Sequence, residues 1–237
     1  MSVKNKIKLK ITVYSLVILI IGSVGFLFVK EPSLLFTDAA NTPPKTVIID
    51  AGHGGFDGGA VVNDVLEKDI NLKIANSLSN MLRASGFKVI CTRTDDSSTE
   101  SDPNATIAAR KRSDLNNRLK IAKENPDAIF VSIHLNKFQS SSVKGAQMFY
   151  APKNDDAKKL AECLKTSVKD LLQPENHRTV KSGTKSTFLL YYSPIPTVIA
   201  ECGFMSNPNE FSLLQTEKYQ SQMAFAIFCG ILKYFNT

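Results

Sequence analysis

Residues 46–59, TVIIDAGHGGFDGG, decide the fold. The β-branched run of residues 46–49 predicts a buried strand, and the glycine-rich stretch after it predicts a tight loop. Further along, Ile70, Ile74 and Leu78 recur at helical spacing, and Gly86 stands where a glycine commonly follows a helix. This order of strand, loop and helix is the first half of a βαβ unit, and it predicts an α/β fold.

Short apolar runs continue to alternate with helical patterns toward the C-terminus. We expect further strands at residues 87–92, 128–133, 146–150, 188–191 and 197–200. The apolar faces of further helices lie within residues 107–122, 160–171 and 223–235. Residues 94–105 and 173–186 are polar and turn-rich, so we expect loops there. Residues 45–237 therefore predict a single α/β domain with a mostly parallel, mixed central sheet and helices on both faces.

The N-terminal segment has the pattern of a membrane anchor. Four lysines within residues 4–10 precede nineteen uncharged residues, 11–29, and Lys30 follows. A helix of about 20 apolar residues spans a bilayer, and flanking lysines hold that end on the cytoplasmic side. We expect a signal anchor at residues 1–30, with a transmembrane helix at 11–29 and a linker at 31–44. The domain would then lie outside the cytoplasm, anchored to the membrane or secreted if the segment is cleaved.

The positive charge of the chain is concentrated in this segment. The whole chain carries a formal charge of +7, but residues 1–30 contain five lysines and no acidic residue. The rest of the chain has 24 basic and 22 acidic residues. A nucleic-acid-binding domain needs clustered basic residues on its folded part, so this class of protein is not favoured.

Cys91, Cys163, Cys202 and Cys229 form no C-x-x-C unit, and all lie in apolar runs. We expect small buried thiols, with a disulfide as the alternative for an exported domain.

Four chemically active side chains are predicted to gather at one edge of the sheet. His53, His134 and Glu201 each follow a predicted strand, and Glu67 opens the helix after the first loop. In open α/β sheets, functional groups gather beyond the carboxyl ends of the strands. Two imidazoles and one carboxylate, with a vacant position for water, are a ligand set of catalytic zinc. The other carboxylate could serve as general base and acid.

Simpler interpretations of these residues remain open at this point. Glu67 alone could be an acidic residue favoured by the helix dipole, and His177 lies in a polar loop where a solvated histidine is expected. Glu201 follows an apolar run, where a carboxylate costs free energy unless it is paired or near a cation. A phosphate-binding loop is disfavoured because Asp57 stands where the dinucleotide pattern requires glycine, and no Gly-Lys-Ser/Thr tripeptide occurs.

Four ordered blocks carry a family resemblance that runs from about residue 45 to the C-terminus. Residues 47–60 (VIIDAGHGGFDGGA), 67–69 (EKD), 132–136 (SIHLN) and 201–208 (ECGFMSNP) resemble the zinc-dependent N-acetylmuramoyl-L-alanine amidases. The resemblance implies that His53, Glu67 and His134 bind one Zn²⁺ and that Glu201 is the catalytic carboxylate. It also implies cleavage of the amide between the lactyl group of N-acetylmuramic acid and L-alanine of the stem peptide.

The short chain, the single N-terminal segment and the lack of appended modules resemble the spore-cortex members of this family. The implied setting is spore-cortex maturation or germination. The implied partners are peptidoglycan, the membrane and an accessory activator protein, without nucleic acid. Two other functions stay open, namely a catalytically silent peptidoglycan-binding or scaffold protein and a zinc peptidase acting within the stem peptide.

Two details of the resemblance concern individual segments. Cys202 stands where the family often has glycine or alanine, and we expect its thiol to turn inward. In related enzymes an inserted helix can block the cleft, and residues 94–106 and 173–186 are the two segments in which one could occur.

Overall fold

The computed structural model describes residues 45–237, so the expected anchor at residues 1–30 and linker at 31–44 lie outside the described residues. Within residues 45–237, no helix is both long enough and apolar enough to cross a membrane.

A six-stranded mixed sheet forms the centre of the domain, in the order β4-β1-β5-β8-β6-β7. Four neighbouring strands are parallel, and β6 pairs with β8 in the antiparallel direction. The strands are β1 (Thr46–Ala51), β4 (Lys88–Cys91), β5 (Ile129–Asn136), β6 (Gln147–Tyr150), β7 (Lys181–Ser182) and β8 (Thr197–Phe204). A separate small hairpin joins β2 (Val61–Val62) to β3 (Val65–Leu66). The predicted fold class, a mostly parallel mixed sheet, is confirmed.

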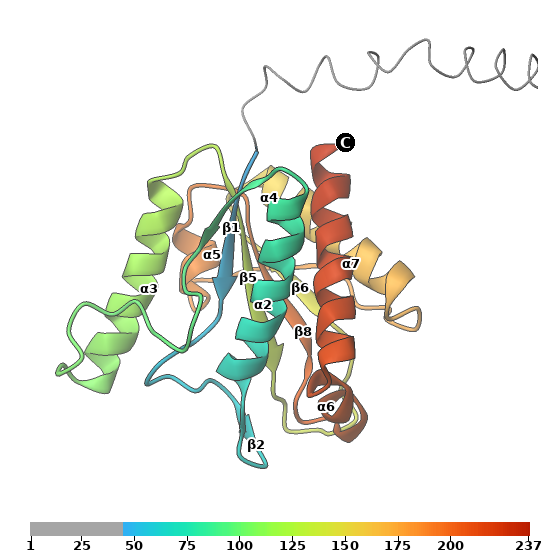
Figure 1. Ribbon diagram of the computed structural model, residues 1–237, viewed down its shortest axis with the longest axis horizontal. Coiled ribbons are helices and arrows are strands. Elements are labelled where there is room, and N and C mark those ends of the chain that lie inside the picture. The colour runs from blue at the N-terminus through green and yellow to red at the C-terminus, as the bar shows by residue number, and fades with distance from the viewer. Residues whose placement is uncertain (1–44) are drawn as a thin grey trace, which may run out of the picture. The chain divides into compact units, whose positions relative to one another are not determined.

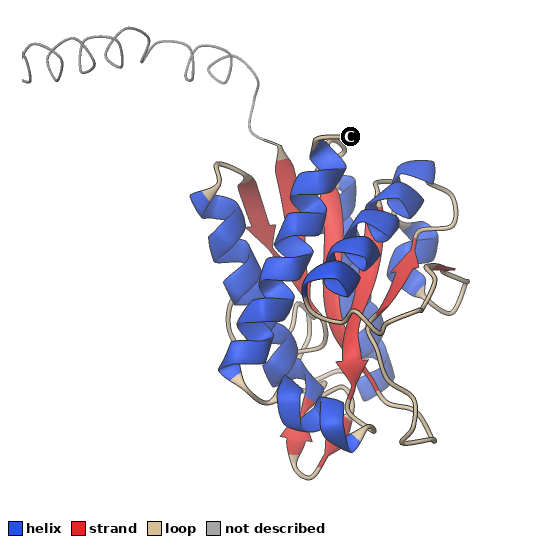
Figure 2. Cartoon of the chain, turned by 90° about the vertical axis from the view of Figure 1, so that its right-hand side faces the viewer, coloured by secondary structure: helices blue, strands red, loops and turns tan. Residues whose placement is uncertain are grey.

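Helices cover both faces of the sheet, as predicted. Three of them, α2 (Glu67–Ala84), α4 (Asp155–Leu171) and α7 (Glu217–Phe235), pack over one face and bury the larger apolar core. The other face is covered by α3 (Ile107–Lys123) and α5 (Phe188–Tyr192), which enclose a smaller apolar cluster around Ile48 and Phe130. The short helix α6 (Pro208–Leu214) follows β8 (Figures 1 and 2).

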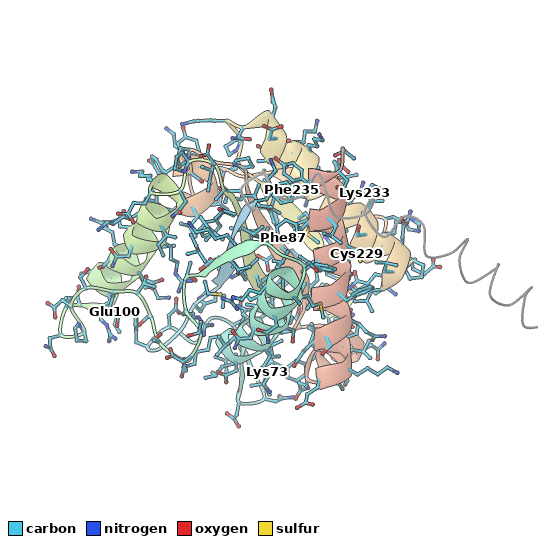
Figure 3. All side chains as sticks on the ribbon, turned by 45° about the horizontal axis from the view of Figure 1, so that its top comes forward. Lys73, Phe87, Glu100, Cys229, Lys233 and Phe235 are labelled. Carbon is cyan, nitrogen blue, oxygen red and sulfur yellow. The ribbon has the colours of Figure 1, made fainter. Side chains whose placement is uncertain are left out.

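Local sequence signals explain where several helices begin and end. Gly86, with a φ of 86°, follows the C-terminus of α2, in the left-handed region that glycine enters at little cost. Asn207 caps α6 by accepting a hydrogen bond from the backbone N–H of Glu210, and Pro208 occupies the first turn. At the amino ends of the strands, the rings of Phe87 and Phe235 lie 5.5 Å apart (Figure 3).

The structure corrects some of the predicted elements. Residues 188–191 are not a strand but part of the helix α5. Their apolar run fits either element because it is too short to show a period, and burial of Leu189 and Leu190 satisfies both. Residues 94–106 and 173–186 contain no helix, and the second segment includes the two-residue strand β7. β5 and β8 also extend beyond their predicted ends, so His134 and Glu201 lie within strands.

A buried ion pair joins α3 to β1. The Arg118 guanidinium contacts the Asp50 carboxylate, and the two side chains are 2% and 0% exposed. Asp50 also accepts hydrogen bonds from Thr92, which directly follows β4, and from Ser132 on β5. Arg118 donates to the backbone oxygens of Ala51 and His53 as well. These contacts satisfy two charges that would otherwise be costly to bury.

We therefore expect Arg118→Met to lower the free energy of unfolding by about 3–5 kcal/mol, because it leaves the Asp50 charge buried and unpaired. Adding Asp50→Asn should restore part of this loss, since the second change removes the orphaned charge. Urea denaturation of the two single variants and the double variant measures the coupling. Arg112→Met, on the exposed side of the same helix, is the matched control. Purely additive losses in the double variant would contradict this coupling.

Candidate metal site at the carboxyl ends of the strands

The four candidate residues come from four elements that meet at one edge of the sheet. His53 follows the end of β1, Glu67 is the first residue of α2, and His134 lies in β5. Glu201 lies in β8, directly opposite His134 in the parallel register. In Figure 1 this edge faces the β2 hairpin and α6.

His53, Glu67 and His134 are close enough to share one metal ion, since one ligand atom from each lies within 4.8 Å of the others. Glu67 is the central member. Its Oε2 lies 3.3 Å from Nε2 of His53, and its Oε1 lies 3.1 Å from Nδ1 of His134. The two imidazole rings meet nearly edge to face, with centroids 4.9 Å apart. The structure thus brings together three residues that are distant in the sequence.

The Glu67 carboxylate is buried and firmly held. It accepts hydrogen bonds from the backbone N–H of Ala60 (2.8 Å) and of Leu135 (3.0 Å), and from the side-chain amide of Asn71 (3.1 Å). Burial alone would raise the pKa of Glu67, but its bonds to His134 and His53 outweigh this and hold the pKa well below its usual range. The carboxylate is therefore ionised and presented to both imidazoles.

Two glycines make room for this cluster. A Cβ atom on Gly52 would lie 2.3 Å from ring atoms of His134, and one on Gly59 would lie 2.6 Å from Oε2 of Glu67. Contacts this short do not occur between real Cβ atoms and their neighbours. Positions 52 and 59 therefore need glycine, because the backbone there passes too close to the cluster for a larger residue. This agrees with the tight loop predicted from the sequence.

His53 is held from its other ring nitrogen. Its Nδ1 lies 2.9 Å from Oδ2 of Asp57. Burial lowers the pKa of His53, but the hydrogen bonds to Asp57 and Glu67 outweigh it and raise the pKa to about 9 in the metal-free protein. The backbone of His53 has a φ of 62°, in the left-handed region that few non-glycine residues adopt.

Glu201 lies beside the cluster but makes no hydrogen bond to it. Its Oε2 atom is buried and has no hydrogen-bond partner within the described part of the chain. Burial raises the pKa of Glu201 to about 7. A carboxylate with such a pKa can both accept and release a proton near neutral pH.

The remaining sequence candidates lie elsewhere. His177 is exposed in the segment before β7 and is not part of the cluster. Cys202 turns to the opposite face from Glu201 and is fully buried, as expected, and all four cysteines are free thiols. Cys91 and Cys229 are only partly buried, however. Within the last sequence block, Asn207 serves as the cap of α6.

The sequence patterns did not reveal the residues that support the cluster. Asp57, Asn71 and Arg118 all contact His53 or Glu67, yet the sequence predicts a supporting role for none of them. One signal was available, because Asp50 interrupts an apolar strand and a buried carboxylate needs a partner. The identity of that partner, 68 residues away in the sequence, could not be read from spacing.

Comparison with known proteins agrees with this geometry. The family model described as N-acetylmuramoyl-L-alanine amidase matches residues 47–233. The chain belongs to this amidase family.

Individual members of the amidase family are similar over most of their length. The germination-specific N-acetylmuramoyl-L-alanine amidase of Bacillus subtilis (strain 168) is 36% identical over 192 residues, covering 81% of this chain and 80% of that protein. The CwlD amidase of Clostridioides difficile, solved in complex with the GerS lipoprotein, is 43% identical with a TM-score of 0.77, covering 81% and 98%. The amidase AmiC2 of Nostoc punctiforme is 30% identical with a TM-score of 0.70, covering 81% and 98%.

The raised pKa of Glu201 makes a prediction for the stability of the metal-free amidase. With a pKa of about 7 when folded and 4.5 in the unfolded chain, the folded protein retains a proton that the unfolded chain has lost. The contribution of Glu201 to stability should therefore fall as the pH rises from 4.5 to about 7, by about 3 kcal/mol in total.

Glu201→Gln removes this titration. The variant should gain stability relative to the unaltered protein as the pH rises, and the gain should be complete at about pH 8. Chelator-treated samples, unfolded with urea at pH values on both sides of this range, measure it. Glu175→Gln, in an exposed loop position, is the control. An offset for Glu201→Gln that does not change with pH would contradict the raised pKa.

Proposed function

We propose that residues 45–237 form the catalytic domain of a zinc-dependent amidase. It hydrolyses the amide between the lactyl group of N-acetylmuramic acid and L-alanine of the peptidoglycan stem peptide. Membership of the amidase family supports this substrate. The observation that carries the proposal is the convergence of His53, Glu67 and His134 beside Glu201.

The donor set fits zinc. Two imidazoles and one carboxylate are a common protein ligand set of catalytic zinc, which leaves a position open for water or substrate. In this chain, the ionised Glu67 lies between the two imidazoles. The backbone at Gly52 and Gly59 passes so close to His134 and Glu67 that no side chain larger than that of glycine fits at these two positions. His53, Glu67 and His134 would hold the ion. When bound, zinc supplies Lewis-acid activation of water and of the amide carbonyl.

Glu201 is assigned the proton transfers. The pKa of about 7 belongs to the metal-free protein. The position of Glu201 opposite His134 would let its carboxylate accept the proton of the attacking water and then deliver it to the leaving nitrogen of L-alanine. Burial raises this pKa, and the buried Oε2 has no hydrogen-bond donor from the protein within the described residues. No covalent intermediate is needed, and the Cys202 thiol, buried with its pKa raised by burial, does not take part.

The proposed location of the domain is the outer side of the membrane. Residues 1–30 are assigned as a signal anchor with its span at 11–29, and residues 31–44 as a linker, on the pattern of lysines and apolar residues. Peptidoglycan lies outside the cytoplasm, so a domain exported in this way meets its substrate.

The proposed biological setting is germination of bacterial spores, through spore-cortex peptidoglycan. The similarity to a germination-specific amidase supports it. We further propose an accessory protein at the membrane, because the CwlD amidase, 43% identical to this chain, was solved in complex with a lipoprotein.

The experiment is a product analysis on purified peptidoglycan. The zinc-loaded protein should release peptides that begin with free L-alanine and leave glycan strands with bare lactyl groups. Glu201→Gln should lower turnover by about 10²–10⁴-fold, the usual contribution of general acid–base catalysis, while still binding one zinc ion per chain. Chelation should abolish activity, and Zn²⁺ should restore it.

Three outcomes would contradict parts of this function. Products cut between later residues of the stem peptide would identify a zinc peptidase. Tight binding to peptidoglycan without any cleavage, with zinc and partner supplied, would identify a silent binding or scaffold protein. Near-normal turnover by zinc-loaded Glu201→Gln would remove Glu201 from the mechanism.

A further inference from the structure

We propose that Asp57 is a positioning residue for the metal site. It fixes the imidazole of His53, and Lys111 on α3 fixes Asp57 in turn. The inference rests on the proposed zinc site for its functional consequence, while the contacts themselves belong to the metal-free protein.

The two ring nitrogens of His53 have separate partners. Nδ1 lies 2.9 Å from Oδ2 of Asp57, and Nε2 lies 3.3 Å from Oε2 of Glu67. A carboxylate on one ring nitrogen fixes the tautomer of a histidine, so that the other nitrogen is free to bind a metal. Asp57 therefore selects Nε2 as the nitrogen that His53 presents to the cluster.

Asp57 is itself held in place. Its Oδ1 lies 3.0 Å from Nζ of Lys111 and accepts a hydrogen bond from the backbone N–H of Gly59 at 3.4 Å. The backbones of Gly54 and Asp57 exchange two hydrogen bonds of 3.0 Å each, which close a tight turn around His53. Both carboxylate oxygens thus have partners, and the carboxylate cannot turn without losing one of them.

The same helix holds the backbone of His53. Nη2 of Arg118, seven residues after Lys111 on α3, donates to the carbonyl oxygen of His53 at 2.7 Å. His53 has a left-handed backbone conformation, which costs a non-glycine residue about 1–3 kcal/mol. Such a conformation persists only where neighbouring groups hold it, and the bond from Arg118 is one such contact. Helix α3 therefore fixes His53 twice, at its backbone through Arg118 and at its ring through Lys111 and Asp57.

The position of Asp57 excludes it from the proposed ligand set. It lies on the side of His53 away from Glu67, and the cluster of possible ligand atoms consists of His53, Glu67 and His134. Its role is to act through His53. Outer carboxylates of this kind typically contribute about 10–100-fold to metal affinity.

The test compares Asp57→Ala, Asp57→Asn and Lys111→Met with two controls. Asp127→Asn is exposed at the opposite edge of the sheet, and Lys120→Met is exposed on the same helix as Lys111. Zinc affinity is measured by competition with a chromophoric chelator. Asp57→Ala should bind zinc about 10–100-fold more weakly. Asp57→Asn, which can still accept the hydrogen bond, should recover part of the loss, and Lys111→Met should give a smaller loss.

A second readout does not depend on zinc. Nitrogen-15 NMR of the metal-free protein reports the hydrogen bond at Nδ1 of His53, which stays protonated whether the imidazole is neutral or, below its pKa of about 9, charged. The unaltered protein and both controls should show Nδ1 bonded to Asp57, and Asp57→Ala should lose this signature without a change in overall fold, checked by the backbone spectrum.

The two readouts separate this inference from the proposed function. Zinc affinity within twofold of the unaltered protein in Asp57→Ala, with an unchanged His53 signal, would overturn the positioning role. If His53 responds as expected but the unaltered protein binds no zinc, the positioning of the ring stands and the zinc amidase function fails.

Discussion

The contact on which the site depends is the one between the buried Glu67 carboxylate and two imidazoles. The same carboxylate accepts hydrogen bonds from the loop after β1, at Ala60, and from β5, at Leu135. It therefore ties the start of α2 to the two segments that carry the histidines. A buried carboxylate is stable only when such partners are present, so the position of each element is constrained by the charge of one side chain.

Helix α3 connects this site to the stability of the domain. Its buried residues are few, namely Arg118, Leu119 and Ala122, so apolar burial holds it only in part. The ion pair with Asp50 and the bond to the His53 carbonyl add to that packing. The same interactions that hold α3 against the sheet also hold the loop of His53, so stability and site geometry are coupled.

Much of the fold and the gathering of the site could be predicted because both follow from pattern. Parallel strands end at a common edge, so residues at or near the carboxyl ends of separate strands, such as His53 and His134, are brought together by topology. The apolar run at residues 188–191 was wrongly predicted as a strand, since a run so short has no period. The pairs Asp50–Arg118 and Asp57–Lys111 could not be predicted, because they depend on where α3 lies in space. The predicted anchor lies outside the described residues and stays a prediction.

The central claim is that His53, Glu67 and His134 bind one zinc ion together. X-ray absorption at the zinc edge of the loaded protein tests it most directly. The account predicts one zinc per chain with two imidazole nitrogens and one carboxylate oxygen at about 2.0–2.2 Å, and loss of this signal in Glu67→Ala. A sulfur ligand at about 2.3 Å, or an unchanged spectrum in Glu67→Ala, would contradict it.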